Sequence, residues 1–173
     1  MGKNTFVALL RGIMPMNPNM QSAKLKQAFE EMGFKNVRTV ISSGNVIFES
    51  SSNDSQALES KIETALPKLL GFSSSTIVES KENIQRLLEK NPFKNAVKGK
   101  PNVTFFKQPP KRSELPEGSK YFKSYGLVGG VFCYTVDLDV VKTPEAMLTL
   151  EKNFGKGITT RTWQTVERIF AKM

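Results

Sequence analysis

The sequence contains no histidine and one cysteine, and it has no long hydrophobic run. The absence of histidine excludes Ser-His and Cys-His nucleophile pairs, histidine general bases and imidazole metal sites. A single cysteine excludes an internal disulfide framework and is typical of a reducing compartment. No run approaches the roughly 18 apolar residues of a membrane span, and the first residues lack the pattern of a signal peptide. We expect a cytoplasmic protein without a membrane segment.

With histidine absent, any catalysis would depend on carboxylates, Lys, Arg, Tyr, Ser or Thr. Cys133 lies in an alternating run, and we interpret it as a small buried strand residue rather than a reactive thiol. Asp137 and Asp139 flank the end of that run, but two carboxylates alone are poor evidence for a cation site, and surface acids are the preferred interpretation. Glycine-rich phosphate-binding motifs are absent. We predict neither a metal nor a cofactor.

The formal net charge is +9, and it is concentrated in the middle of the chain. Residues 80–125 contain 11 Lys or Arg against 4 Asp or Glu. Such a segment could attract nucleic acid or another polyanion. Most of these residues are scattered lysines in polar connections, however, and no RNA-binding motif accompanies them. A solubilising surface is the preferred interpretation, and nucleic acid is a weakly supported partner.

Apolar periodicity and turn residues predict the order β-α-β-β-α-β in residues 1–79. A strand over 5–10 precedes a helix that begins with Ser22 as its cap and carries an apolar stripe ending near Met32. Two strands follow, joined by a hairpin at Ser42-Ser43-Gly44, and then come a second helix from about Asp54 and a strand ending at residue 79. This order favours a ferredoxin-like split βαβ arrangement, with the third strand between the first and the second.

The remaining chain predicts a second, degenerate copy of this module. Residues 80–101 are predicted to be a linking helix and a basic connection. From residue 102 we expect a strand, a short helical or irregular piece, a hairpin at Gly129-Gly130, a helix from Thr143-Pro144-Glu145, and a last helix over 161–171. The fold class is thus α+β, with two ferredoxin-like modules (1–79 and 102–173) in one compact unit and an extra C-terminal helix. One larger mixed sheet is the alternative.

This topology brings several polar residues to one end of the first sheet. The loop after the first strand and the Ser42-Ser43-Gly44 hairpin must emerge together, beside the start of the first helix. An arginine and helix amides form a good environment for a phosphate or carboxylate. The bland interpretation is that these are ordinary turn residues. The candidate ligand-binding residues here are Arg11, Gly12, Asn17, Asn19, Ser42, Ser43 and Asn45.

A second candidate group comprises Thr160, Arg161 and Trp163. We expect Thr159 and Thr160 to cap the last helix, which places Arg161 in its first turn, against the preference of the helix dipole. This local conflict suggests a specific partner for Arg161, such as a carbonyl, a carboxylate or a ligand. Trp163 has the spacing of a core residue more than that of a stacking platform.

Three stretches resemble a bacterial family catalogued as domain of unknown function 1697. They are "FVALLRGI" (6–13), "LKQAFEEMGFKNVRTVISSGNVIFES" (25–50) and "TTRTWQTVERI" (159–169). The resemblance implies a duplicated α+β protein related to ferredoxin-like units, with no assigned activity and no catalytic residue to transfer. Many members have a glycine-rich loop after the first strand, where this chain has the stiffer "GIMPMNPNM". Residues that fit the family pattern are Arg11, Gly12, Ser43, Gly44, Asn45, Thr160, Arg161 and Trp163.

Three functional hypotheses follow. The first is a non-enzymatic binding module for a small anionic ligand or for nucleic acid. The second is an enzyme of unassigned reaction, which would use Arg11 and Arg161 as electrostatic stabilisers. The third is a structural or protein-interaction role, for example as a homodimer through an open sheet edge.

Overall fold

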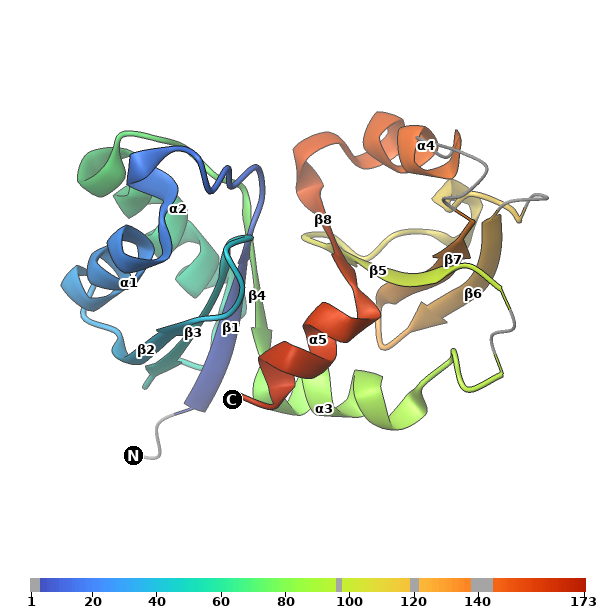
Figure 1. Cartoon of the computed structure of the whole chain (residues 1–173), viewed down its shortest axis with the longest axis horizontal. Helices are drawn as coiled ribbons and strands as arrows, with labels where there is room; N and C mark the ends of the chain where they lie inside the picture. Colours follow the sequence, from blue (N-terminus) through green and yellow to red (C-terminus); the bar gives the residue numbers. More distant parts are fainter. Residues whose placement is uncertain (1–3, 96–97, 119–121, 138–144) are drawn as a thin grey trace. The chain divides into compact units, whose positions relative to one another are not determined.

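The computed structural model of the chain describes residues 4–95, 98–118, 122–137 and 145–173 (Figure 1). The chain divides into two compact units, which are described separately. The first comprises residues 1–84 and 168–173, and the second comprises residues 85–167. Each unit contains one four-stranded sheet in which all neighbouring strands are antiparallel. The α+β class is confirmed, and the alternative of one larger mixed sheet is wrong.

The first unit follows the predicted order. Its elements are β1 (Asn4–Leu10), η1 (Pro18–Met20), α1 (Ser22–Glu31), β2 (Lys35–Thr39), β3 (Asn45–Ser50), α2 (Ser55–Leu70) and β4 (Thr76–Ser80). The strands lie in the order β2-β3-β1-β4, so the third strand separates the first from the second, as the split βαβ topology requires. The wider relationship to ferredoxin-like proteins stays a prediction.

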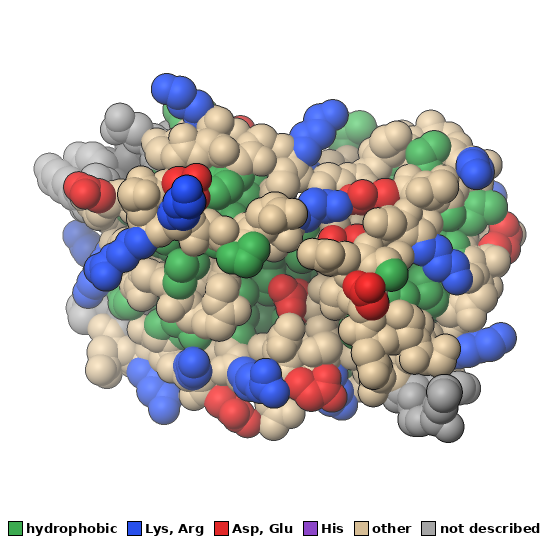
Figure 2. Space-filling model, turned by 180° about the vertical axis from the view of Figure 1, so that it is seen from behind, with side chains coloured by type: hydrophobic (Ala, Val, Ile, Leu, Met, Phe, Trp, Pro, Cys, Tyr) green, Lys and Arg blue, Asp and Glu red, His purple; other side chains and the backbone are tan. Residues whose placement is uncertain are grey.

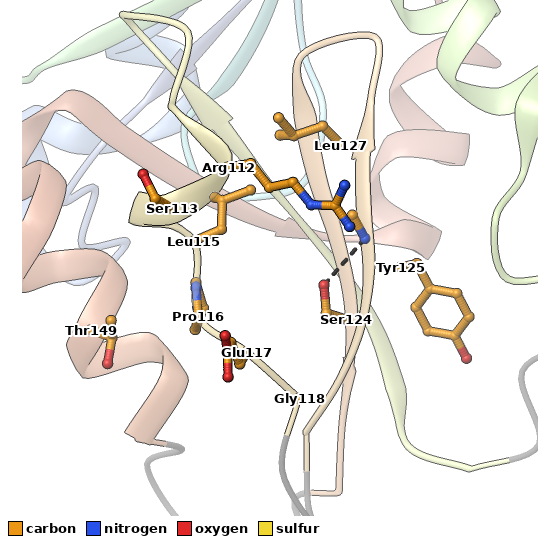
Figure 3. Close-up of a pocket in the computed structure, with 11 residues that line it drawn as sticks. Arg112, Ser113, Leu115, Pro116, Glu117, Gly118, Ser124, Tyr125, Leu127 and Thr149 are labelled. Carbon is orange, nitrogen blue, oxygen red and sulfur yellow. Dashed lines mark hydrogen bonds between the residues drawn. The ribbon is translucent and has the colours of Figure 1, made fainter.

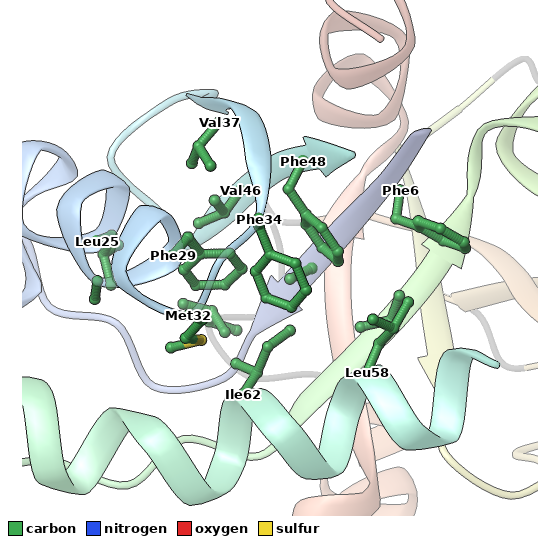
Figure 4. Packing of buried hydrophobic residues seen from close by; sticks show 14 of the residues in the cluster. Phe6, Leu25, Phe29, Met32, Phe34, Val37, Val46, Phe48, Leu58 and Ile62 are labelled. Carbon is green, nitrogen blue, oxygen red and sulfur yellow. The ribbon is translucent and has the colours of Figure 1, made fainter. Parts of the chain in front are cut away.

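Helices α1 and α2 cover one face of this sheet, and the hydrophobic core lies between the helices and the sheet (Figures 1 and 4). The predicted stripe of α1 is buried, because Leu25 and Phe29 recur at helical spacing on the inner face. Four phenylalanines meet in this core: Phe6 of β1, Phe29 of α1, Phe34 just before β2, and Phe48 of β3. The ring centroids of Phe34 and Phe48 are 4.3 Å apart. The core therefore combines an aromatic cluster with the aliphatic side chains that surround it.

The limits of the two helices differ slightly from the predictions. Ser22 is the first residue of α1, and the residue before it, Gln21, makes no side-chain capping bond, so the predicted Ser22 cap is wrong. Asp54 does cap α2, since its Oδ1 accepts a hydrogen bond from the Ala57 N–H at 3.1 Å. Pro67 lies within α2 without ending it, and the helix terminates at left-handed Gly71.

The second unit is reached through α3 (Lys81–Lys90), within which the boundary between the units falls. Its elements are β5 (Lys100–Phe106), η2 (Arg112–Glu114), β6 (Phe122–Val128), β7 (Val131–Val136), α4 (Glu145–Phe154), η3 (Gly155–Gly157) and β8 (Ile158–Thr162). Helix α5 (Trp163–Phe170) crosses back into the first unit. The predicted Gly129-Gly130 hairpin joins β6 to β7. The predicted helix start at Thr143-Pro144, and Asp139, lie outside the described residues.

Sheet order in the second unit repeats that of the first. The strands lie in the order β6-β7-β5-β8. In chain order β5, β6, β7 and β8 correspond to β1, β2, β3 and β4, so this is the same arrangement as β2-β3-β1-β4 in the first unit. Helix α4 takes the position of α2 in the chain. The connection between the first two strands differs: α1 in the first unit is replaced by the three residues of η2. Among the described residues, the second unit therefore has the same strand order, with only the short η2 between its first two strands.

Candidate functional site

The loop after β1 and the β2–β3 hairpin meet, as the topology predicts. The Leu10 N–H donates a hydrogen bond of 2.8 Å to the Gly44 carbonyl. Gly44 has a φ of +78°, and a Cβ added there would lie 2.6 Å from Cγ1 of Ile13. Position 44 therefore favours glycine for two reasons: the backbone has a positive φ, and the loop after β1 approaches too closely to leave room for a Cβ.

Several of the predicted polar residues hold this corner itself together. The buried side-chain amide of Asn45 donates to the Val40 carbonyl at 2.9 Å and to Oγ of Ser43 at 3.0 Å. Oδ1 of Asn17 accepts the N–H of Asn19 at 3.0 Å, which starts η1. These side chains perform the turn chemistry expected of their residue types.

Arg11 is fixed through its backbone at the end of β1. Its N–H donates to the Ser75 carbonyl at 3.0 Å, and its own carbonyl accepts from Oγ of Ser74 at 2.8 Å. The side chain is half-buried, whereas Gly12 and Ser42 are exposed. The structure thus brings Arg11 to the same corner as Ser43, and a ligand role for these residues stays a prediction.

The second candidate group lies in the other unit, and its predicted conformation is wrong. Residues 158–162 form strand β8, which pairs with β5, instead of capping and starting the last helix. Ile and Thr are β-branched and favour a strand, which explains the difference. The cap is Thr162, whose Oγ1 accepts the N–H of Thr165 at 3.2 Å. Because Arg161 precedes the helix, the expected conflict with the helix dipole does not arise.

Arg161 and Thr160 are tied into the sheet. Nη1 of Arg161 donates to Oγ1 of Thr159 at 2.8 Å and to the Thr160 carbonyl at 2.9 Å. Burial lowers the pKa of Arg161 to about 10, which still leaves the guanidinium charged at neutral pH. Oγ1 of Thr160 lies 2.8 Å from Oγ1 of Thr104. The contacts of the Arg161 guanidinium shown here are thus with its own strand, β8, and a ligand role for Arg161 stays a prediction.

Trp163 lies in an aromatic cluster. It is 8% exposed, and its ring meets Phe93 edge to face with 5.1 Å between centroids. Phe93 in turn meets Tyr125 at 5.2 Å. These contacts are typical of core packing, which is the interpretation that its helical spacing favours.

A hollow in the second unit provides a different candidate site (Figure 3). Its volume is about 1430 Å³, and it lies among η2 with the residues that follow it, strand β6 and helix α4. Figure 3 shows the Arg112 side chain extending from η2 toward the Ser124–Gly126 stretch of β6, whereas the Tyr125 ring points away from the other lining side chains. The lining comprises Arg112, Ser113, Leu115, Pro116, Glu117, Gly118, Ser124, Tyr125, Gly126, Leu127 and Thr149.

In the described part of the second unit, this hollow lies beside η2, which stands between β5 and β6 as α1 stands between β1 and β2. In the first unit α1 fills the space beside α2 and over β2 and β3. The counterparts of β2 and α2 are β6 and α4, and both contribute to the lining of the hollow. The three residues of η2 thus line a concave region together with β6 and α4.

The turn that carries Arg112 is held in place by its neighbours. Oε2 of Glu114 accepts the Lys111 N–H at 2.6 Å, and the Glu114 carbonyl accepts from Nδ2 of Asn153 on α4 at 2.8 Å. The Glu114 carboxylate is therefore used within the turn. Arg112 is presented from a short element that is anchored to α4.

Strand β6 contributes a bulge to the hollow. Its pairing with β7 shifts register between Ser124 and Gly126, and Gly126 has a φ of +77°. Oγ of Ser124 accepts the Gly126 N–H at 3.2 Å, so the hydroxyl hydrogen remains able to donate to another group. The bulge thus places a donor opposite Arg112.

The sequence did not indicate this site. Arg112 belongs to the basic middle of the chain, which we interpreted as a solubilising surface. The available signal was the stretch 107–118, which has neither helical nor strand periodicity where a duplicated module calls for a helix. On the face shown in Figure 2, Lys and Arg side chains are spread among acidic and uncharged ones.

Within the part of the chain that the structure describes, no three Cys, Asp or Glu residues gather as a metal site would require. None of the helices in the described ranges is long and apolar enough to span a membrane.

The fold defines the class as an α+β protein with two four-stranded antiparallel sheets of the same strand order. The chain belongs to the family described as protein of unknown function (DUF1697), whose sequence model matches residues 3–124. It is similar to the solved structure of the conserved bacterial protein SP0830 from Streptococcus pneumoniae, with 23% identity, a TM-score of 0.78 and 99% coverage of both chains. No curated protein matches the sequence. The family assignment is confirmed, and it leaves the function unassigned.

Proposed function

We propose that this protein is a binding module for a small anionic ligand and that the hollow of the second unit is its site. The observation that carries the proposal is the position of Arg112, whose guanidinium extends into the hollow from a turn anchored by Glu114. A guanidinium on a fixed element offers paired N–H donors to a carboxylate or phosphate. The site thus replaces the Arg11 corner as the preferred candidate.

The rest of the lining defines the other properties of the ligand. Ser113, Ser124 and Thr149 contribute hydroxyl groups, and Leu115 and Leu127 contribute apolar surface. Small-molecule sites typically combine a few polar groups with apolar walls. We therefore propose a ligand that has one carboxylate or phosphate group and an apolar portion.

Isothermal titration calorimetry with a panel of carboxylates and phosphate monoesters tests the proposal. We expect Arg112→Ala to weaken the binding of a positive compound by about tenfold, the usual effect of losing a charge-assisted hydrogen bond. Lys111→Ala is the matched control, because it removes the same charge one residue away and outside the lining. Equal affinities for the two variants, or no binding by wild type, would overturn the proposal.

The same titration compares the two candidate sites, the hollow beside Arg112 and the Arg11 corner. Arg11→Ala reports on the site at the end of β1, where the first turn of α1 has no side-chain cap from Gln21. A loss confined to Arg11→Ala would move the function to that corner. We do not extend the proposal to nucleic acid, because Trp163 and Phe93 are buried and offer no stacking surface.

We further propose the cytosol as the location. The single cysteine supports it, since Cys133 is a buried residue of β7 and not part of a disulfide. Fractionation of cells that express the tagged protein checks this expectation.

A further inference from the structure

We infer that the first unit carries a separate binding site for a phosphate group, in a hollow formed by Lys35, Lys61 and the serines that end β3. The hollow has a volume of about 440 Å³. Its walls come from the start of β2, the end of β3 and the first turns of α2. All of its residues belong to the first unit, so the inference does not depend on the proposed function of the second unit.

The two lysines provide the positive charge. Lys35 begins β2, and Lys61 lies on α2, so the two ammonium groups reach the hollow from different elements. The Lys61 side chain has a defined position, since its Nζ lies 4.9 Å from the centre of the Phe34 ring. Phe34 is itself 4% exposed and fixed in the core. An ammonium over an aromatic ring keeps N–H donors available for an anion.

The acidic residue of the lining already has a partner. Oε1 of Glu49 accepts a hydrogen bond from Nδ2 of Asn36 at 2.7 Å. Asn36 has a φ of +49°, a conformation that asparagine tolerates better than most residues. Two lysines and one carboxylate leave the lining with a net positive charge, which favours an anion over a cation.

Ser50 and Ser52 line the hollow, and their hydroxyl groups are able to donate to a ligand. Oγ of Ser50 accepts the Ser52 N–H at 3.1 Å, and Oγ of Ser52 accepts the Asp54 N–H at 3.2 Å. Each oxygen is occupied as an acceptor within the turn, so each hydroxyl hydrogen remains to be donated. Two hydroxyl donors and two ammonium groups match the several acceptor oxygens of a phosphate. The volume admits a molecule larger than phosphate itself, which points to a phosphate monoester as well as the free ion.

Calorimetric titration with inorganic phosphate and with glycerol 3-phosphate tests the inference at low ionic strength. We expect Lys35→Gln and Lys61→Gln each to weaken binding about threefold and the double variant about tenfold, as expected for exposed ion pairs. Lys68→Gln is the matched control, because it removes a charge from the last turn of α2, away from the hollow. Thermal unfolding of each variant shows that the fold is retained.

Backbone amide chemical shifts locate the bound anion. We expect phosphate to move the amide resonances of Ser50, Ser51 and Ser52 in wild type and in Arg112→Ala, which separates this site from the hollow of the second unit. Tighter binding of glycerol 3-phosphate than of phosphate identifies a monoester, and the reverse order identifies the free ion. Phosphate binding lost in Arg112→Ala but retained in the lysine double variant would overturn the inference, and so would the absence of binding.

Discussion

The Glu59 side chain accepts a hydrogen bond from the backbone N–H of Val78, with 2.9 Å between Oε1 and the nitrogen. One turn further along α2, Oε1 of Glu63 accepts the N–H of Thr76 at 2.7 Å. Thr76 and Val78 belong to β4, the edge strand of its sheet, which pairs with β1. Two carboxylates thus satisfy backbone donors of an edge strand that could otherwise pair with another chain.

Removing one of these carboxylates should destabilise the first unit. Glu59→Ala leaves the Val78 N–H buried without its acceptor, and such a loss costs about 1–3 kcal/mol. Glu59→Gln retains an oxygen acceptor and serves as the control. We expect urea unfolding to show a lower free energy of unfolding for Glu59→Ala than for Glu59→Gln. Equal stability of the two variants would show that the bond contributes nothing.

The same contacts bear on the possible homodimer through a sheet edge. If the carboxylates block the β4 edge, wild type should not dimerise through it. We expect the double variant Glu59→Ala/Glu63→Ala to self-associate more than wild type, measured by light scattering after size-exclusion chromatography. A dimer of wild type that Thr76→Pro disrupts would contradict this expectation, because proline removes a strand N–H donor.

The pKa of Glu79 predicts a pH dependence of stability. Burial raises this pKa above 4.5, a hydrogen bond from Asn83 opposes the rise, and the charge of Glu59 adds to it. A carboxyl with a raised folded-state pKa destabilises the fold once it ionises. The pH therefore has no effect through this group below the unfolded pKa near 4.5; stability falls as the pH rises from that value to the folded pKa, and it levels off above it.

Glu79→Gln should remove this loss. The amide oxygen still accepts from Asn83, whose Nδ2 lies 3.0 Å from the native carboxylate. We expect the variant to be more stable than wild type at pH 7 and equally stable near pH 4, as measured by chemical unfolding across the pH range. An advantage that grows toward low pH would contradict the predicted sign.

The predictable parts of the fold were those with apolar periodicity. Leu25 and Phe29 recur at the spacing of a helix that covers a sheet, and burial of that stripe determines α1. Strand β8 was missed because its threonines and Arg161 carry no alternating apolar pattern and run directly into a helix. Its conformation comes from pairing with β5, a tertiary contact that local sequence does not display.

The candidate sites show the same division. Topology correctly predicted that the segments around Ile13 and Gly44 meet, because strand direction determines where connections emerge. The hollow beside Arg112 could not be predicted in this way, since its lining includes the irregular residues around η2, which have no apolar periodicity. The composition of the basic connection around Arg112 does not indicate whether the connection covers the sheet or leaves part of it open.

Cys133 should be unreactive in the folded protein. The side chain is buried in β7, and burial raises the pKa of its thiol to about 12. The thiolate is the reactive species, so little of it exists at pH 8. We expect iodoacetamide, followed by mass spectrometry, to label Cys133 only after unfolding in urea. Complete labelling of the folded protein within minutes would mean that the strand is accessible.

Gly44→Ala should test the contact between the β2–β3 hairpin and the loop after β1. Gly12→Ala is the matched control, because Gly12 has a φ of +75°, close to the +78° of Gly44, but open space where its Cβ would lie. Both variants pay the cost of a left-handed alanine, about 1–2 kcal/mol. Only Gly44→Ala also forces a Cβ to within 2.6 Å of the Ile13 side chain, and such overpacking adds about 1–3 kcal/mol. We expect chemical unfolding to show the larger loss for Gly44→Ala, and a loss no greater than that of Gly12→Ala would show that the two segments do not pack closely.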